Sequence, residues 1–300
     1  MADEIVAITG ISGFLGYGAA LEALQAGYRV RGIIRKTSQA DKLKSTLPAE
    51  FSSKVDFFIT TDFDKDYFRP SVDITLSLLR ASAASGTVKR VVVCSSVSAY
   101  IPSLEYASGK LSKEVIESDD DFIHYTGKEQ FPHHLFAYAA SKSLALDATD
   151  NFVKTEAPPF DVVVVVPSFV FGPGKLKESA EEFARGSNAI LLGHLMGKPT
   201  GPLLTISVHI DDVSKAHVAA LKPSVAPGKY LLDSEKTDWA IPRQVVKTHF
   251  GKVFPEEVPT QTIKLHLEGS KAEKAFGFRF KSFETQVKDT VEYYLGLVSN

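Results

Sequence analysis

Short apolar runs alternate with longer segments of mixed polarity along the first half of the chain. Residues 5–9 (Ile-Val-Ala-Ile-Thr) form a compact apolar run, as parallel strands do when both faces of their sheet are covered. After a glycine-rich turn comes an Ala- and Leu-rich segment, residues 17–26, which stops at Gly27, a residue type that often ends helices. Residues 28–34 are again apolar. The pattern predicts a strand, a helix and a second strand.

The same alternation continues further along the chain. Strands are predicted at residues 55–60, 88–94 and 161–166, and helices at residues 71–84 and 138–153. Strands that alternate with helices of this length are typical of a parallel sheet with helices on both faces. We therefore predict an α/β fold with a Rossmann-type, doubly wound parallel sheet.

One unit of this pattern is missing. A doubly wound sheet of strand order 3-2-1-4-5-6 needs a further strand between the third one and residues 88–94. Only the 27 residues 61–87 lie there, and they contain one helix and no apolar strand. A strand with its crossover helix takes about 30 residues. We predict that one βα unit is absent, with its junction near residues 63–65.

The glycine-rich turn after the first strand reads Gly10-Ile11-Ser12-Gly13-Phe14-Leu15-Gly16. Between a strand and a helix, the first glycine permits a tight turn, the second lets the backbone approach a pyrophosphate, and the third lets the helix close onto the sheet. The start of the helix offers N–H groups and a positive dipole end to phosphates. The alternative is a turn without a ligand. We expect a dinucleotide site formed by Gly10, Ser12, Gly13, Phe14 and Gly16.

The end of the second predicted strand indicates which nucleotide is bound. Sites for NAD usually carry an acidic residue there for the ribose 2′-hydroxyl, whereas a 2′-phosphate needs cations. Here Arg35-Lys36 is followed by Lys42 and Lys44, with no acid before Asp41. A planar guanidinium suits a phosphate monoester. The alternative is a solvated basic turn, but we expect NADPH, with Arg35 and Lys42 at its 2′-phosphate.

Composition and charge narrow the class of protein. The 300 residues are 44% hydrophobic and include a single cysteine, so an internal disulfide framework is excluded. With 34 basic and 36 acidic side chains the net charge is −2, which disfavours nucleic-acid binding. No secretory signal, membrane-spanning segment or metal-binding spacing is recognisable. We expect a cytoplasmic protein in a reducing compartment.

Two Tyr-x-x-x-Lys sequences occur, and their surroundings differ. Tyr106 and Lys110 flank Gly109 in a polar segment after Pro102, where we expect a loop. Tyr138 and Lys142 lie among alanines at the start of a predicted helix, so both side chains share one face. The Tyr138 pair is therefore the candidate for chemistry.

These features together identify a family resemblance. The Gly-x-x-Gly-x-x-Gly turn, Ser95-Ser96 at the end of a strand and Tyr-Ala-Ala-Ser-Lys on the next helix are similar to the extended short-chain dehydrogenases/reductases. More narrowly, the chain resembles the dihydroflavonol-reductase-like branch and fungal aldehyde or carbonyl reductases. The similarity extends to Arg35 and Lys42, to Pro167-Ser168 after the last parallel strand, and to residues 208–213, and it covers most of the chain.

The resemblance implies a role for each catalytic candidate. Tyr138 would donate a proton to a carbonyl oxygen while a hydride arrives from C4 of the nicotinamide. Lys142 would favour the phenolate by its charge and hold the nicotinamide ribose. Ser96 would orient the substrate oxygen, although alone it is also a common strand-ending residue. Pro167 and Ser168 would contact the cofactor.

The missing unit bears on cofactor binding. It is either absent from this version of the chain or lost from the protein, and the strand at 88–94 then either pairs with the first strand or leaves a gap. Both arrangements move Ser96 relative to the cofactor, and a shift of about 1 Å can cost about 100-fold in rate. We predict weaker NADPH binding than a complete relative shows.

Two regions follow from these assignments. Residues 1–167 form the NADP-binding domain, including the catalytic helix from about residue 138, and residues 168–300 form mainly a smaller α/β substrate-binding lobe. Apolar residues 189–192 and 195–196 either line a substrate pocket or pack in the core.

The predicted function is NADPH-dependent reduction of a small hydrophobic aldehyde or ketone, by a monomer or homodimer without nucleic-acid or membrane partners. The alternative is a reductase-derived protein without redox activity, an isomerase, cyclase or binding scaffold, which the missing unit motivates. A nucleotide-sugar epimerase is disfavoured by Arg35, where an acid would be expected.

Overall fold

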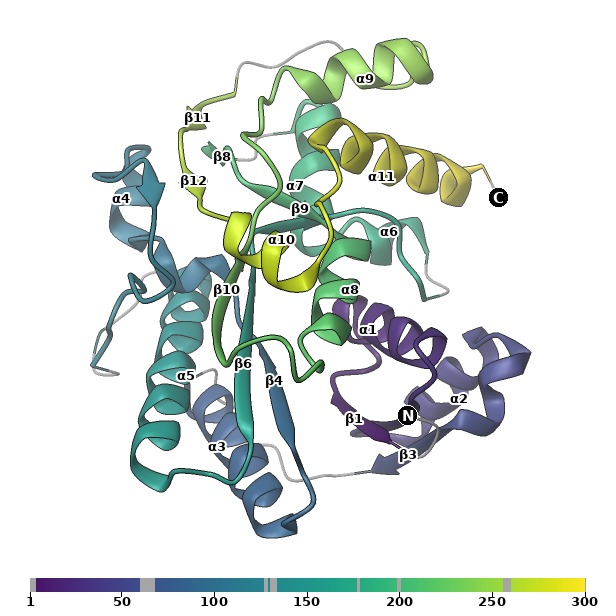
Figure 1. Cartoon of the computed structure of the whole chain (residues 1–300). Helices are drawn as coiled ribbons and strands as arrows, with labels where there is room; N and C mark the ends of the chain where they lie inside the picture. The colour runs from purple at the N-terminus through teal and green to yellow at the C-terminus, as the bar shows by residue number, and fades with distance from the viewer. Residues whose placement is uncertain are drawn as a thin grey trace.

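Strands and helices alternate along the first half of the structure as the pattern predicts. The computed structural model (Figure 1) describes residues 4–59, 68–126, 129, 134–176, 179–198, 201–255 and 260–299. The predicted junction near residues 63–65 lies outside these described residues. In chain order the elements are β1 (Ile5–Thr9), α1 (Phe14–Gln25), β2 (Arg29–Ile34), α2 (Thr37–Thr46), the 3₁₀ helix η1 (Ala49–Lys54), β3 (Val55–Ile59), α3 (Phe68–Ser85), β4 (Arg90–Cys94), the 3₁₀ helix η2 (Val97–Tyr100), α4 (Ser103–Ser108), β5 (Val115–Ile116), α5 (His134–Glu156) and β6 (Asp161–Pro167).

The second half contains shorter strands and more irregular connections. None of the helices in the described ranges is both long and apolar enough to cross a membrane. The elements are β7 (Phe169–Phe171), α6 (Ala180–Phe183), α7 (Gly186–Leu195), β8 (Leu203–Leu204), β9 (Ser207–His209), α8 (Ile210–Ala219), β10 (Gly228–Leu232), α9 (Ile241–His249), β11 (Thr262–Ile263), β12 (His266–Leu267), α10 (Ser270–Phe276) and α11 (Phe283–Val298).

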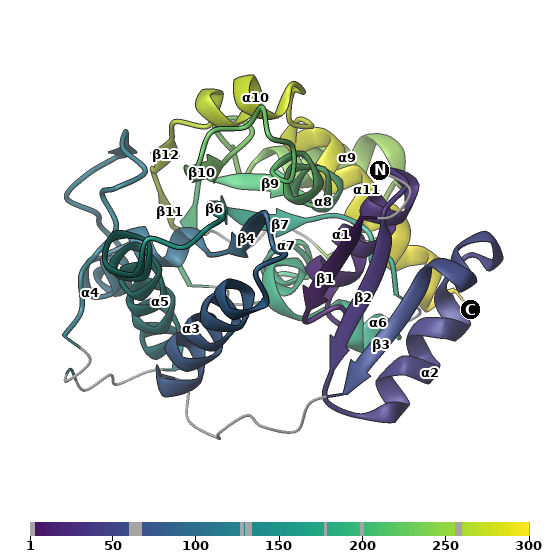
Figure 2. The ribbon, with the colours of Figure 1, turned by 60° about the horizontal axis from the view of Figure 1, so that its bottom comes forward.

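The central strands form two parallel sheets of three strands each. In one sheet β2 lies between β1 and β3, and in the other β6 lies between β4 and β10. Within the described residues β1 pairs only with β2, and β4 only with β6. The strand at residues 88–94 therefore does not pair with the first strand, and the sheet is interrupted where the sequence lacks a unit. Figure 2 shows the two sheets next to each other, with β1 on the side of β4.

Helices cover both faces of the β4–β6–β10 sheet. Along β6, Val162, Val164 and Val166 pack in one apolar cluster with residues of α3 and α5. Val163 and Val165 belong to the cluster on the other face, which includes α8 and α10. This alternation is the period of two that a strand with both faces covered requires.

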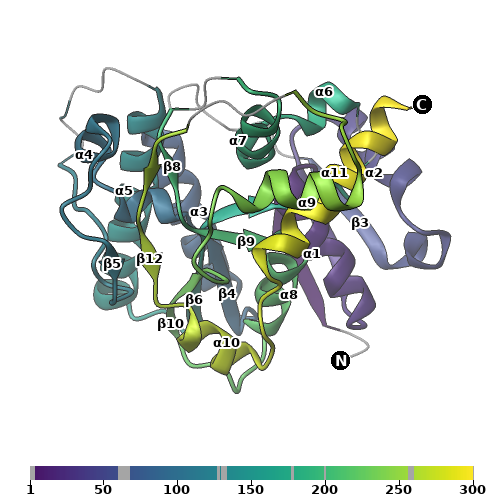
Figure 3. The same ribbon diagram turned by 90° about the horizontal axis from the view of Figure 1, so that it is seen from above.

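Helices α1 and α8 join the two sheets on one side of the molecule. They lie side by side (Figure 3) and approach closely at Gly18, where an added Cβ would lie 2.3 Å from Ser214 Oγ. The packing of α1 against α8 thus joins the two sheets, whereas β1 and β4 do not pair within the described residues.

Candidate active site

The glycine-rich turn has the conformation that the sequence predicts. Gly10 has a φ of +67°, the left-handed region that glycine enters without strain. A Cβ on Gly16 would lie 2.2 Å from the Gly10 carbonyl oxygen, so only glycine allows α1 to start this close to β1. Gly13 precedes the first residue of α1, and no side chain caps the helix there. The turn is shaped to bring an anion to the N-terminus of α1.

A polar pocket of about 140 Å³ lies beside this turn. Ser12 and Phe14 of the turn line it, together with Lys42 from α2. Lys175 and Arg185 from the second half of the chain also line the pocket, and sequence reasoning missed both. Three cations from three chain segments thus lie at one edge of the glycine turn, together with the carboxylate of Glu182, which lies 3.9 Å from the Lys42 ammonium. The excess of positive charge favours phosphate groups.

Gln39 connects the turn to the start of α2. Its side-chain amide donates to Ser12 Oγ at 2.8 Å, and its Oε1 accepts from the backbone N–H of Arg35 at 2.9 Å and of Lys36 at 3.1 Å. Arg35 is exposed at the end of β2 and does not line the pocket that contains Lys42. The structure therefore places Lys42 against the turn, while Arg35 lies at the edge of the same region.

The three predicted catalytic residues lie on two elements that pack together. Ser96 follows β4 and precedes η2, and its Oγ accepts from the backbone N–H of Ser98 at 3.2 Å. Tyr138 and Lys142 lie one turn apart on α5, with the Lys142 ammonium 5.7 Å from the centre of the Tyr138 ring. Helix α5 packs against η2. Tyr138 is 40% exposed.

The second Tyr-x-x-x-Lys pair has a different geometry. Tyr106 lies on the short helix α4, so the prediction of a loop at this residue was wrong. Gly109 ends α4 in a left-handed conformation, and Lys110 lies beyond the helix. The Tyr106 hydroxyl donates to the Pro202 carbonyl at 2.9 Å. Tyr106 and Lys110 therefore do not share one helix, which agrees with the prediction that this pair lacks helical geometry.

Pro167 and Ser168 lie at the carboxyl end of β6, the edge where open α/β sheets bind ligands. The Ser168 backbone N–H donates to the Leu232 carbonyl of β10, which fixes the chain at this point. The next residue of that segment, Asp233, is buried and accepts from the Ser207 N–H at 2.8 Å. Burial raises the pKa of the Asp233 carboxyl to about 8.

Cys94, at the end of β4, has two cationic neighbours that the sequence did not reveal. Burial alone would raise the pKa of its thiol, but the hydrogen-bonded His217 imidazole and the Lys142 ammonium lower it. His217 comes from α8, and its Nδ1 lies 2.7 Å from the Val213 carbonyl oxygen.

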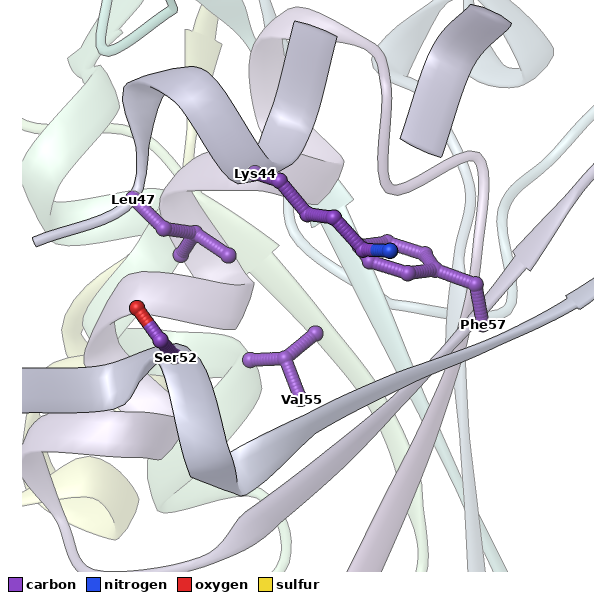
Figure 4. A pocket seen from close by; sticks show the side chains of 5 residues that line it. All are labelled: Lys44, Leu47, Ser52, Val55 and Phe57. Atoms are coloured by element: carbon purple, nitrogen blue, oxygen red, sulfur yellow. The ribbon is translucent and has the colours of Figure 1, made fainter. Parts of the chain in front are cut away.

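A second small pocket, of about 170 Å³, lies between α2, η1 and β3 (Figure 4). Lys44, Leu47, Ser52, Val55 and Phe57 line it, and the Lys44 ammonium lies 5.8 Å from the centre of the Phe57 ring. It contains none of the predicted site residues. Like the polar pocket beside the glycine turn, it is smaller than the roughly 300 Å³ at which small-molecule pockets usually begin.

The fold and the site define a class of protein. A strand, a glycine turn and a helix at the edge of a parallel sheet, with a serine after a neighbouring strand and a Tyr–Lys pair on a helix, are the parts of a dinucleotide-binding Rossmann protein. Residues 6–232 match the NAD dependent epimerase/dehydratase family. The chain belongs to this family, within the extended short-chain dehydrogenases/reductases.

Comparison with known proteins identifies similar reductases. Ketoreductase sphI of Aspergillus fumigatus is 32% identical, with 98% of each chain covered. Ketoreductase CTB6 of Cercospora nicotianae is 30% identical, with 99% of this chain and 96% of the relative covered. The fold is similar to the crystal structure of Gre2 from Candida albicans in complex with NADPH, at 22% identity and a TM-score of 0.78, over 98% of this chain and 99% of the other.

The relatives are longer than this chain within the matched region. The alignment with Ketoreductase sphI extends over 333 positions, 33 more than the 300 residues of this chain. The alignment with Ketoreductase CTB6 extends over 358 positions. Both relatives therefore contain residues that have no counterpart here.

Proposed function

We propose that the protein is an NADPH-dependent reductase that converts a hydrophobic aldehyde or ketone to the alcohol. The Tyr138–Lys142 pair carries this proposal, because α5 holds the Lys142 ammonium beside the Tyr138 ring. Helix α5 also packs against η2, whose N-cap residue is Ser96. Two ketoreductases matched over nearly the whole chain support the reaction class. These relatives give no support to the alternative of a protein without redox activity.

The chain's own residues handle the proton and the substrate oxygen. Tyr138 donates its phenolic proton to the carbonyl oxygen as that oxygen becomes a hydroxyl. Lys142 faces the phenol with a positive charge, which stabilises the phenolate that remains. Ser96 orients the carbonyl oxygen through a hydrogen bond. NADPH, when bound, supplies the hydride that the carbonyl carbon accepts.

The cofactor assignment rests on the glycine turn and the cations beside it. Gly10, Gly13 and Gly16 leave room for a pyrophosphate at the N-terminus of α1, with Ser12 and Phe14 along the same turn. Arg35 and Lys42 serve the 2′-phosphate, and Lys175 and Arg185 add charge to the same pocket. Pro167 and Ser168 contact the cofactor at the carboxyl end of β6. The NADPH complex of the similar Gre2 supports this cofactor.

The proposal also includes the two regions of the chain, the substrate class and the cellular setting. Residues 1–167 form the NADP-binding domain and residues 168–300 mainly the substrate-binding lobe. The substrate is a small hydrophobic carbonyl compound, and the enzyme acts in the cytoplasm as a monomer or homodimer.

A titration with NADPH tests the proposal. Purified protein is titrated while the enhancement and blue shift of nicotinamide fluorescence are followed, and the titration is repeated with NADH. We expect saturable binding that is clearly tighter for NADPH, and then turnover of members of an aldehyde and ketone panel. A folded sample that binds neither nucleotide would contradict the proposal for this chain.

A further inference from the structure

Ser98 directs two hydrogen-bond donors at the side-chain oxygen of Ser96. The Ser98 backbone N–H donates to Ser96 Oγ at 3.2 Å, and the Ser98 hydroxyl donates to the same atom at 3.0 Å. A serine hydroxyl has two lone pairs and a single proton. Ser98 therefore occupies both lone pairs of Ser96 Oγ, and what remains of this hydroxyl for a further hydrogen bond is its proton.

Hydrogen bonds hold these two serines in a fixed position relative to α5. The Ala99 N–H donates to the Ser96 carbonyl at 3.1 Å, and the Ala99 carbonyl accepts from the Ile123 N–H at 2.8 Å. The Ile123 carbonyl in turn accepts from the hydroxyl of Ser143 on α5. A continuous series of hydrogen bonds thus connects the turn of the two serines with the helix that carries the catalytic Tyr–Lys pair.

We infer that Ser98 is a positioning residue for carbonyl reduction, because it fills both acceptor sites of Ser96 Oγ and so leaves the Ser96 proton for the substrate oxygen. This inference rests on the proposed function, in which hydride transfer to the carbonyl carbon leaves negative charge on that oxygen. A donor that is already aimed at such charge lowers the barrier. The hydrogen bonds that Ser96 accepts also polarise its own O–H group, which strengthens its donation.

The opposite direction of the hydroxyl hydrogen bond would have a different consequence. If Ser96 donated to Ser98 Oγ, its single proton would be used between the two serines, and no proton would remain for a carbonyl oxygen, which is itself an acceptor. The Ser98 backbone N–H occupies one lone pair of Ser96 Oγ in both cases. The two directions therefore predict opposite effects when the Ser98 hydroxyl is removed.

Steady-state kinetics of Ser98 variants test this inference. Ser98→Ala removes one donor to Ser96 and should lower kcat roughly five- to tenfold, the effect of about one hydrogen bond, while KM changes by less than about twofold. Ser98→Thr retains both donors and should keep kcat within about twofold of the original chain. If the hydroxyl hydrogen bond has the opposite direction, Ser98→Ala frees the Ser96 proton, and an unchanged or raised kcat would overturn the inference.

A double-mutant cycle shows whether Ser98 acts through Ser96. Ser96→Ala removes the atom that Ser98 contacts, so the addition of Ser98→Ala should change kcat by less than about twofold. A further loss as large as that of the single variant would overturn the inference, because Ser98 would then act independently of Ser96. Ser95→Ala is the matched control: the buried Ser95 hydroxyl has no hydrogen-bond partner among the described residues, so its removal should leave kcat unchanged.

Folding and cofactor binding of each variant are measured alongside the kinetics. The free energy of unfolding in urea and the affinity for NADPH should stay close to those of the original chain, because Ser98 acts on the substrate oxygen. If Ser98→Ala does not fold, Ser98→Cys takes its place, since a thiol is of similar size and only a weak donor. This variant should also lower kcat with KM nearly unchanged, and a folded Ser98→Cys variant with full kcat would overturn the inference.

Amide hydrogen exchange tests the geometry without any assay of reduction. In Ser96→Ala the Ser98 amide loses its acceptor and should exchange at least roughly fivefold faster. The Ala99 amide, which donates to the Ser96 backbone carbonyl, serves as the reference. Unchanged exchange at Ser98 would overturn the inference and leave the proposed function intact. An original chain that reduces no member of the carbonyl panel would instead contradict the proposed function and, with it, the role inferred for Ser98.

Discussion

Tyr138 and Tyr106 are the same side chain in two different settings. Tyr138 is 40% exposed on α5, beside the Lys142 ammonium. Tyr106 is partly buried, and its hydroxyl is already engaged by the Pro202 carbonyl. Burial raises the pKa of the Tyr106 phenol, so this hydroxyl serves packing, while that of Tyr138 is available to a substrate.

This contrast predicts opposite effects of the same substitution. Tyr138→Phe should lower kcat for carbonyl reduction by about 100-fold or more, because it removes the proton donor, and leave the free energy of unfolding nearly unchanged. Tyr106→Phe should keep kcat and lower the free energy of unfolding by about 1 kcal/mol through the lost hydrogen bond. Steady-state kinetics and urea unfolding measure both quantities. Loss of activity in Tyr106→Phe alone would reverse our assignment of the site.

Lys42 and Lys44 provide a second matched pair, two residues apart on α2. Lys42 lines the pocket beside the glycine turn, whereas Lys44 lies over the Phe57 ring in the other pocket (Figure 4). Lys42→Ala should weaken NADPH binding roughly tenfold and leave NADH binding unchanged, because only NADPH carries the 2′-phosphate. Lys44→Ala should change neither affinity. Fluorescence titrations of both variants with both nucleotides decide whether Lys42 recognises that phosphate.

Some candidate site residues could be predicted from the sequence and others could not. Ser96, Tyr138 and Lys142 follow from short patterns within one strand end and one helix turn, so local sequence carries the signal. Lys175 follows a loop marked only by Gly172–Gly174, and Arg185 precedes α7. Both reach the glycine turn through tertiary packing, which no spacing along the chain reveals.

At the scale of elements, Gly16 determines how closely α1 approaches β1. Gly16→Ala would place a methyl group 2.2 Å from the Gly10 carbonyl oxygen, so the turn must shift. We expect the free energy of unfolding to fall by about 1–3 kcal/mol and NADPH binding to be lost. Gly296, in the last turn of α11, has open space at its Cβ position, so Gly296→Ala should stabilise the protein by up to about 1 kcal/mol. Urea unfolding compares the two, and equal stability of both variants would show that α1 tolerates a side chain here.

Element positions were predictable because the apolar runs are compact. The predicted strand at residues 88–94 is observed as Arg90–Cys94, and the helix predicted at residues 71–84 as Phe68–Ser85. The described residues contain no strand between β3 and β4, in agreement with the prediction from the shortness of that segment. The 58% exposure of Phe58 on β3 was not predictable, because it depends on the register between strands. Register is set by pairing that one strand's sequence does not contain.

At the scale of the whole molecule, buried ionisable groups make stability depend on pH. Burial raises the pKa of Asp233 to about 8, and burial lowers the pKa of His209 to about 4. Between about pH 4 and 6.5 the unfolded chain binds one proton more at His209 and one fewer at Asp233, so the two effects on stability oppose each other. Of these two groups, only Asp233 still differs in protonation between the folded and unfolded states above pH 6.5.

Stability should therefore fall as pH rises from 6.5 to 8. Over this range the folded chain keeps a proton on Asp233 that the unfolded chain has lost, which corresponds to about 2 kcal/mol at about 1.4 kcal/mol per pH unit. Urea unfolding at pH 6.5 and pH 8 measures the loss, and Asp233→Asn is the control, since its amide has nothing to titrate while other groups are unchanged. The variant should lose clearly less stability over this interval than the original chain. Equal losses in both would show that Asp233 is ionised in the folded protein at neutral pH, stabilised by the N–H groups of Ser207 and Leu267.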